Sequence, residues 1–449
     1  MTTLPPPQDP LCVPDPATIA EAIPVVANGP VFGDSRASYG EGSPFEWTIR
    51  LSETGAAHRF VAEHKGAILF VAEWKNWYLW TGSHWKEDVE GGVYRLLWRT
   101  VELFVTEAAD TLKEAEEAFA LEASQDNQGR LDMAKVMGKF GHSLQQRRVQ
   151  TSVLDLASHH SEVVTTFRKL NQGIWLLNTP GTTVDLRDGS TKANDPADLI
   201  TACTPVPYTP DAPAPRFRQF IDEITADAQA EPRPDLADYL QRLLGLGITG
   251  SVREHILPIF HGFFGANGKG TLINCVRTAA GPDYASVAAE NLVLRPDDGG
   301  DSHPTKIADL YNKRIVVSSE LEESAKLAES LIKRLTGADP LKGRRMRQDP
   351  WEFEPTHKLF LLTNHRPNVI GTDGGLWRRM RLIPFDRSFH GDNADPQLPE
   401  KLQQEAEGIL AWLVQGAIFY YATGERPPEV VQAATLKYRE EQDDLGHFI

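Results

Sequence analysis

One stretch of this sequence constrains its fold more than any other, because residues 256–279 join an apolar run, a glycine-rich turn and an apolar-periodic segment. The run Ile256–His261 predicts a strand, and the segment from Lys269 onward predicts a helix. Glycine lets backbone N–H groups approach an anion closely, and a helix amino terminus adds its dipole. The turn Gly265–Thr271 therefore predicts a cradle for phosphate. The alternative, a glycine turn with a solvated lysine, is disfavoured by the flanking strand and helix.

All seven residues of the turn are candidates for nucleotide binding: Gly265, Ala266, Asn267, Gly268, Lys269, Gly270 and Thr271. In the phosphate-loop pattern the lysine reaches the β- and γ-phosphates of ATP, and a hydroxyl after it ligates Mg²⁺. The match departs at two positions, since Phe263 replaces the first glycine and Gly270 replaces the Ser/Thr. Thr271, one place later, is the candidate metal ligand, directly or through water. A Gly-Lys-Gly-Thr ending also occurs in nucleotide kinases, so the prediction of ATP binding stands.

Carboxylates follow a second apolar run, Arg314–Ser319. Glu320, the first residue after this predicted strand, is the candidate to polarise the attacking water and to ligate Mg²⁺. Glu322 is second, because it lies on the same side of an extended chain, and Glu323 is assigned to solvent. The alternative is an acidic first turn of a helix over Ser324–Leu335, which the helix dipole favours without any catalysis.

Polar residues also follow a third predicted strand, Lys358–Thr363. Asn364, at its carboxyl end, is the candidate to orient the lytic water and sense the γ-phosphate. The alternative is that Asn364 only opens the turn before Pro367. Farther on, the adjacent Arg378 and Arg379 precede a β-like segment. One of them could place its guanidinium on the γ-phosphate of a neighbouring subunit. The alternative is that two of the three arginines Arg378, Arg379 and Arg381 are surface charge.

The remaining patterns divide the chain into segments. The amino-terminal residues are rich in proline, and a second proline cluster marks a boundary after Cys203. Within the first folded segment we expect strands at 67–73, 76–81, 173–178 and 182–186 and helices at 93–123 and 133–170. We therefore expect a proline-rich arm (1–50), a mostly helical α+β domain (51–204), a proline-rich linker with the start of a helical collar (205–235), a three-layer α/β domain (236–425) and a carboxyl-terminal helical stub (426–449).

The ordered set of motifs resembles the superfamily 3 helicase domain of phage, plasmid and poxvirus-type primase-helicases. The residues that carry the resemblance, over about residues 60–449, are Gly265–Thr271, Ile315–Glu322, Leu335–Pro340, Phe353–Pro355, Leu361–Asn364 and Trp377–Arg379, with Trp80–Trp85, Leu177–Gly181 and Val184–Leu186 upstream. The resemblance implies an α/β fold, with a three-layer AAA+ P-loop ATPase motor preceded by a mostly helical α+β domain. It also implies a hexameric ring that hydrolyses ATP with Mg²⁺.

By the same resemblance the chain is expected to be a helicase of phage or plasmid DNA replication that moves 3′ to 5′ on single-stranded or forked DNA. Lys269 and Thr271 would lie on the nucleotide loop, Glu320 and Glu322 on the acidic motif and Asn364 on the sensor. Arg378 or Arg379 would be the arginine finger. The DNA-gripping hairpin would carry Lys342, Arg344, Arg345 and Arg347. The alternatives are a nucleotide-dependent ring-forming DNA-binding or loading protein and, third, a nucleotide kinase.

Two departures from the resemblance shape the expectations. Residues 1–60 are too short for the primase that many relatives carry, so we expect a primase or polymerase on a separate chain. The chain also stops at about Leu436–Ile449, where a winged-helix domain would begin, so we expect a shortened version or a truncated chain.

Charge bears directly on the expected DNA contact. The net charge of −16 argues against a surface coated in nucleic acid. Residues 331–387, however, hold twelve Lys and Arg against six Asp and Glu, a local charge of +6 that leaves −22 elsewhere. We therefore expect a basic channel in an acidic protein. Three separated cysteines and the absence of an apolar run of ~18 residues predict a cytoplasmic protein, in the host if phage-encoded, with no membrane partner.

Overall fold

The computed structural model describes residues 50–289, 292–294, 304–318, 326–345, 349–369 and 374–442. The chain divides into two compact units, Met1–Leu170 and Asn171–Ile449. The division precedes the expected boundary at residue 204, because the segment after Leu170 packs with the second unit. Leu177 and Val184, for example, are fully buried in the second unit's core.

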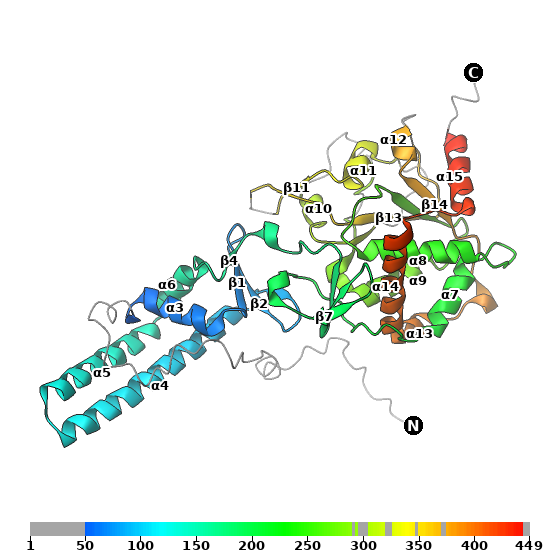
Figure 1. Cartoon of the computed structure of the whole chain (residues 1–449). Coiled ribbons are helices and arrows are strands. Elements are labelled where there is room, and N and C mark those ends of the chain that lie inside the picture. Colours follow the sequence, from blue (N-terminus) through cyan, green and yellow to red (C-terminus); the bar gives the residue numbers. More distant parts are fainter. Residues whose placement is uncertain are drawn as a thin grey trace, which may run out of the picture. The chain divides into compact units, whose positions relative to one another are not determined.

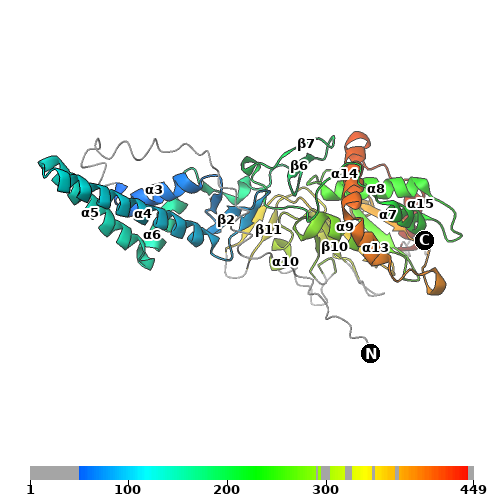
Figure 2. The same cartoon turned by 90° about the horizontal axis from the view of Figure 1, so that it is seen from below.

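The first unit combines helices with a small sheet of order β3-β2-β1-β4, in which β4 is parallel to β1. The long helices α4 and α5 run side by side (Figures 1 and 2). The elements are α3 (Glu53–His64), β1 (Ile68–Val71), β2 (Asn76–Trp80), β3 (Trp85–Glu87), α4 (Gly92–Leu121), α5 (Gln125–Leu144), α6 (Arg147–Ser158), β4 (Val164–Thr165) and η1 (Phe167–Lys169).

One expectation for this unit is wrong: residues 133–170 are not a continuous helix. The helix α5 ends at Leu144, and α6 begins at Arg147 after a turn. After Ser158 the chain leaves the helix, because Val164 and Thr165 pair with β1 instead. Local periodicity cannot reveal this strand, since its partner lies about ninety residues earlier.

The second unit opens with a three-stranded antiparallel sheet and two helices. These elements are β5 (Leu176–Thr179), β6 (Thr182–Asp185), β7 (Thr191–Ala193), η2 (Pro196–Asp198), α7 (Pro215–Thr225) and α8 (Pro234–Ile248). Proline occupies the first turn of both α7 and α8, where its missing N–H has no helical partner to lose.

A five-stranded sheet, parallel throughout, organises the rest of this unit, in the order β14-β8-β13-β10-β9. The strands are β8 (Leu257–His261), β9 (Ala285–Val287), β10 (Ile315–Ser318), β13 (Lys358–Thr363) and β14 (Met380–Pro384), and β11 (Leu341–Gly343) and β12 (Trp351–Phe353) form a separate hairpin. The helices are α9 (Lys269–Tyr284), α10 (Pro304–Ala308), α11 (Glu329–Leu335), α12 (Gly374–Trp377), η3 (Gly391–Asn393), α13 (Leu398–Gln404), α14 (Ala406–Thr423) and α15 (Glu429–Gln442).

Helices cover both faces of this sheet, so the fold is a mixed α/β arrangement in three layers. Alternate strand residues enter two separate cores: Phe260 and Phe360 face α7, α8, α9 and α14, whereas Ile259 and Leu361 face α11, α12 and α15. Strands buried on both faces explain the continuous apolar runs in the sequence. Within the expected carboxyl-terminal helical stub, α15 packs against β14.

Candidate active site

The glycine-rich loop lies between β8 and α9, as the sequence predicts. Gly265, Ala266 and Gly268 all have positive φ, and Gly268 caps the helix that begins at Lys269. A Cβ on Gly268 would lie 2.5 Å from Ile224 Cγ2 on α7, so both backbone and packing require glycine there. At Gly270 a Cβ would meet nothing within 4 Å.

The two departures from the phosphate-loop pattern leave this geometry intact. The Phe263 side chain is 65% exposed and therefore does not fill the loop. The glycine that packing requires is the preceding one, because a Cβ on Gly262 would lie 2.5 Å from Asn267 Oδ1. Thr271 is half-buried in the first turn of α9, two residues after Lys269.

The Lys269 amine is the centre of the candidate site. This residue is only 7% exposed, and its Nζ donates to Gly262 O at 3.2 Å, Asn267 Oδ1 at 3.1 Å and Asn364 Oδ1 at 3.0 Å. Burial lowers its pKa to about 8. All three of these partners are neutral oxygens. An anion placed beside a buried cation that is held by neutral oxygens strongly stabilises the charged form of that cation.

Asn267 braces the loop instead of pointing outward. Its Nδ2 donates to Phe385 O at 3.0 Å and Arg387 O at 2.7 Å, both after β14. Ser388 Oγ adds a bond to Gly265 O at 3.0 Å. The sequence analysis missed this supporting segment, and no local signal marks it, because it lies about 120 residues beyond the loop.

The predicted sensor residue does meet the loop. β13 pairs directly with β8, with Thr363 opposite His261, so Asn364 follows the strand next to the loop's own strand. His261 itself was missed: burial, with Arg366 and Lys269 nearby, lowers its pKa to about 4 and keeps the ring neutral at the end of β8.

The acidic strand β10 is not an immediate neighbour of β8, the strand that leads into the loop. β10 pairs with β13 and β9, so β13 separates it from β8. Ser318, which ends β10, is the last described residue before a gap. Glu320 and Glu322 lie outside the described residues. No group of three or more His, Cys, Asp or Glu side chains within the described ranges could hold a metal ion.

The candidate arginines lie at the opposite edge of the sheet from Lys269. β14 is parallel to β8 and pairs Met380 with Leu257, so Arg378 and Arg379 precede the amino ends of both strands. Arg379 Nε donates to Thr336 Oγ1 at 3.2 Å, whereas Arg378 is exposed. Within one chain these arginines and the loop are therefore not brought together.

The positive charge of the basic segment, residues 331–387, is partly neutralised by carboxylates elsewhere in the chain. The local charge of +6 counted from the sequence therefore overstates the charge available for a DNA channel. Arg381 forms a bidentate pair with Glu425 (2.7 and 2.9 Å), and Arg366 pairs with Glu441. Both carboxylates lie outside residues 331–387. Lys358, also counted in that segment, is buried, and its Nζ donates to the carbonyls of Thr249 and Thr356.

The predicted DNA-binding residues belong to the β11–β12 hairpin. Lys342 on β11 lies opposite Glu352 on β12, so an acidic residue is its cross-strand neighbour. Arg344 is exposed, and its N–H donates to Pro304 O at 3.2 Å beside α10. Arg345 is half-buried. Arg347 lies outside the described residues.

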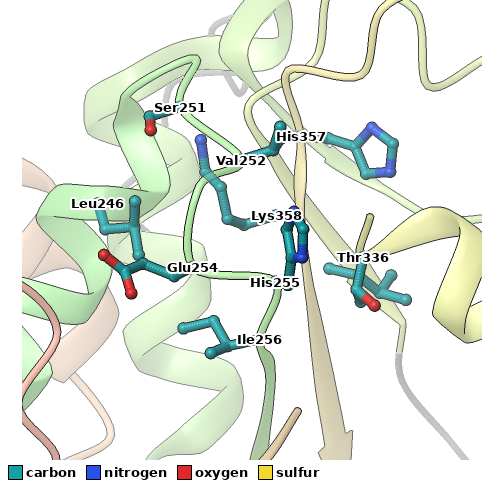
Figure 3. Close-up of a pocket in the computed structure, with 10 residues that line it drawn as sticks. Leu246, Ser251, Val252, Glu254, His255, Ile256, Thr336, His357 and Lys358 are labelled. Carbon is teal, nitrogen blue, oxygen red and sulfur yellow. The ribbon is translucent and has the colours of Figure 1, made fainter. Parts of the chain in front are cut away.

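A small cavity lies at the other end of the sheet, away from the loop. It is lined by residues 251–252 and 254–256, before β8, and by Thr336, His357 and Lys358 (Figure 3). His357 is 2% exposed, and burial lowers its pKa to about 4. The cavity faces the amino ends of β8 and β13, so it is separate from Lys269.

Among the described helices, none has the length and apolar character needed to cross a bilayer.

Comparisons with known proteins match two parts of the chain. The family model described as "D5 N terminal like" matches residues 57–226, and the one described as "Family of unknown function (DUF5906)" matches residues 260–379. The second span contains the loop, Asn364 and both candidate arginines.

Viral proteins are among the relatives. "Putative helicase L207/L206" of Acanthamoeba polyphaga mimivirus is 26% identical over 63% of this chain and 31% of its own length. "Putative helicase 184R" of Invertebrate iridescent virus 6 is 25% identical (52% and 24%), and "Putative helicase 022R" of Frog virus 3 is 24% identical (41% and 21%). The chain thus spans about a third or less of these relatives.

A solved structure, the A-form apo structure of the NrS-1 C-terminal region, is similar at 12% identity and a TM-score of 0.47, over 83% of this chain and 71% of that one. At that TM-score the likeness does not define the fold. The chain is thus similar to a D5 N-terminal-like domain over residues 57–226 and to viral proteins named as putative helicases.

Proposed function

We propose that the second unit is an ATP-hydrolysing motor of the superfamily 3, AAA+ type, which assembles as a hexamer and moves 3′ to 5′ on single-stranded DNA. The observation that carries the proposal is the set of three neutral oxygens around the buried Lys269 amine, at the carboxyl ends of two adjacent parallel strands. Ligands of open parallel sheets bind at this edge. The viral relatives named as putative helicases support a helicase function.

The residues present fit ATP. The loop from Gly262 to Gly268 leaves room for backbone N–H groups to approach phosphate, and α9 directs its amino terminus at the same place. Lys269 would turn part of its hydrogen bonding from protein oxygens to phosphate oxygens. Thr271 and, by proposal, Glu320 would hold Mg²⁺, which when bound supplies charge neutralisation between the β- and γ-phosphates.

Catalysis would divide among groups at the ends of the central strands. Asn364 shares Lys269 with the phosphates, so its amide can orient the lytic water and respond to loss of the γ-phosphate. Glu320 would polarise that water, with Glu322 as the second acidic group. Of the two candidate arginines, Arg378 is the better candidate for the arginine finger that contacts the nucleotide of a neighbouring copy. Arg378 is exposed, whereas Arg379 is hydrogen-bonded to Thr336.

The β11–β12 hairpin would carry the DNA contact, with Lys342, Arg344, Arg345 and Arg347 tracking the backbone without reading bases. Forked DNA would be the substrate of the assembled ring, and a primase or polymerase on a separate chain would be its functional partner.

ATP hydrolysis measured with and without single-stranded DNA tests the proposal. The wild type should show DNA-stimulated turnover that Lys269→Ala and Glu320→Gln abolish, whereas Glu323→Gln, the matched acidic control, should retain it. Ring formation and DNA binding without turnover would instead favour the loading-protein alternative. Turnover that does not depend on protein concentration and survives Arg378→Ala would refute the role of a neighbouring copy.

A further inference from the structure

The carboxyl-terminal helix α15 contacts the loop that follows Asn364. Tyr438, which is fully buried, donates its hydroxyl to Pro367 O, and the Val369 N–H donates to Gln442 Oε1 at 3.0 Å. Glu441 pairs with Arg366, two residues after Asn364. Backbone groups of this loop are therefore satisfied by α15, about seventy residues later in the chain.

The same loop also contacts the chain just after the acidic segment. Leu327 N–H donates to Asn368 O at 3.2 Å, and Lys326 forms a parallel bridge with Asn368. Lys326 is the first described residue after the gap that contains Glu320. One loop thus connects the end of that gap to Asn364, and α15 holds it from outside.

Tyr438 links this loop to the arginine segment as well. Its ring packs edge-on against Trp377, with centroids 5.2 Å apart, and Trp377 directly precedes Arg378. Leu382 N–H on β14 also donates to Thr435 Oγ1, one turn earlier on α15, at 2.9 Å. The helix therefore contacts both segments that carry candidate catalytic side chains.

We propose that α15 is a positioning element, in which Tyr438 and Glu441 hold the loop 365–369 so that Asn364 stays on the Lys269 amine, and in which Tyr438 fixes Trp377 and hence Arg378. The inference rests on the proposed function, since that function gives Asn364 and Arg378 their catalytic roles. Tyr438 acts through other residues and is not itself catalytic.

Two readouts test this role, one of them independent of turnover. The first is the rate at which a dilute acylating reagent labels the Lys269 amine, read by mass spectrometry. Tyr438→Phe keeps the ring but removes the hydroxyl, so the loop should loosen and labelling should rise several-fold, as in Asn364→Ala. Leu436→Ala, on the same helix but 55% exposed, is the matched control and should label like the wild type.

The second readout is the split between kcat and KM for ATP hydrolysis. Tyr438→Phe and Glu441→Arg should each lower kcat about fivefold or more with KM within about twofold, and Arg366→Glu combined with Glu441→Arg should restore kcat. Because the Arg366–Glu441 pair is partly exposed, Glu441→Arg should fold even if Tyr438→Phe does not, and it then tests the same role. Wild-type labelling and kcat in Tyr438→Phe, with only a lower unfolding temperature, would overturn the positioning role. A wild type without Lys269-dependent turnover would refute the proposed function alone, because the labelling result stands by itself.

Discussion

The lowered pKa of Lys269 makes nucleotide affinity depend on pH in a defined direction. A shift from 10.5 to about 8 corresponds to about 3 kcal/mol in favour of the neutral amine. Below pH 8 the amine is charged and affinity should be constant. Above pH 8 binding must add a proton, so the Kd of a fluorescent ATP analogue should rise about fivefold between pH 8 and pH 9, and about tenfold between pH 7 and pH 9.

The variant Lys269→Arg separates this effect from other titrations. Arginine stays protonated across this range, so its Kd should be independent of pH, whereas Lys269→Ala should bind weakly at every pH. The same shift has a second consequence for the free protein. The unfolded chain binds the proton more tightly, so the free energy of unfolding should rise as the pH increases from 8 toward 10.5. A wild-type Kd that is constant from pH 7 to 9, or an arginine variant that shows the same rise, would refute the reasoning.

Three further outcomes follow from local geometry. Gly268→Ala should lower the free energy of unfolding, measured in urea, by about 1–3 kcal/mol, because Gly268 has a positive φ and packs closely against α7. Gly270→Ala should leave this free energy unchanged or raise it by up to about 1 kcal/mol. Equal effects of the two substitutions would contradict the loop geometry. Asn364→Ala should lower kcat at least tenfold while the nearby, exposed Asn368→Ala leaves it within twofold, as steady-state ATPase assays would show. Glu425→Ala should cost about 3 kcal/mol by calorimetry, because it removes the carboxylate that pairs with Arg381 and accepts the buried Tyr239 hydroxyl. A loss below about 1 kcal/mol would show that the pair is effectively exposed.

The local signals in the sequence were sufficient for the loop. Lys269 and its glycines sit between a strand and a helix because adjacent residues determine all three elements. Asn364 could also be placed, since parallel strands bring their carboxyl ends to one edge. The order of the strands could not, because nothing in the β10 sequence shows that β13 lies between it and β8.

Long-range partners explain the other differences. The braces from Ser388 and the carbonyls after β14 lie about 120 residues from the loop, and α15 reaches Pro367 across about 70. The charge count failed for the same reason: Glu425 and Glu441 neutralise arginines in the basic segment from outside it. Composition can give the total charge of a segment, but pairing depends on the fold.

Hydrogen exchange on binding a non-hydrolysable ATP analogue with Mg²⁺ tests the central claim most directly, because it locates the bound phosphates on the chain. The account predicts protection in peptides covering residues 262–272 and Asn364–Val369, and loss of that protection in Lys269→Ala. Protection centred instead on the cavity at Lys358, or protection that persists in Lys269→Ala, would contradict it.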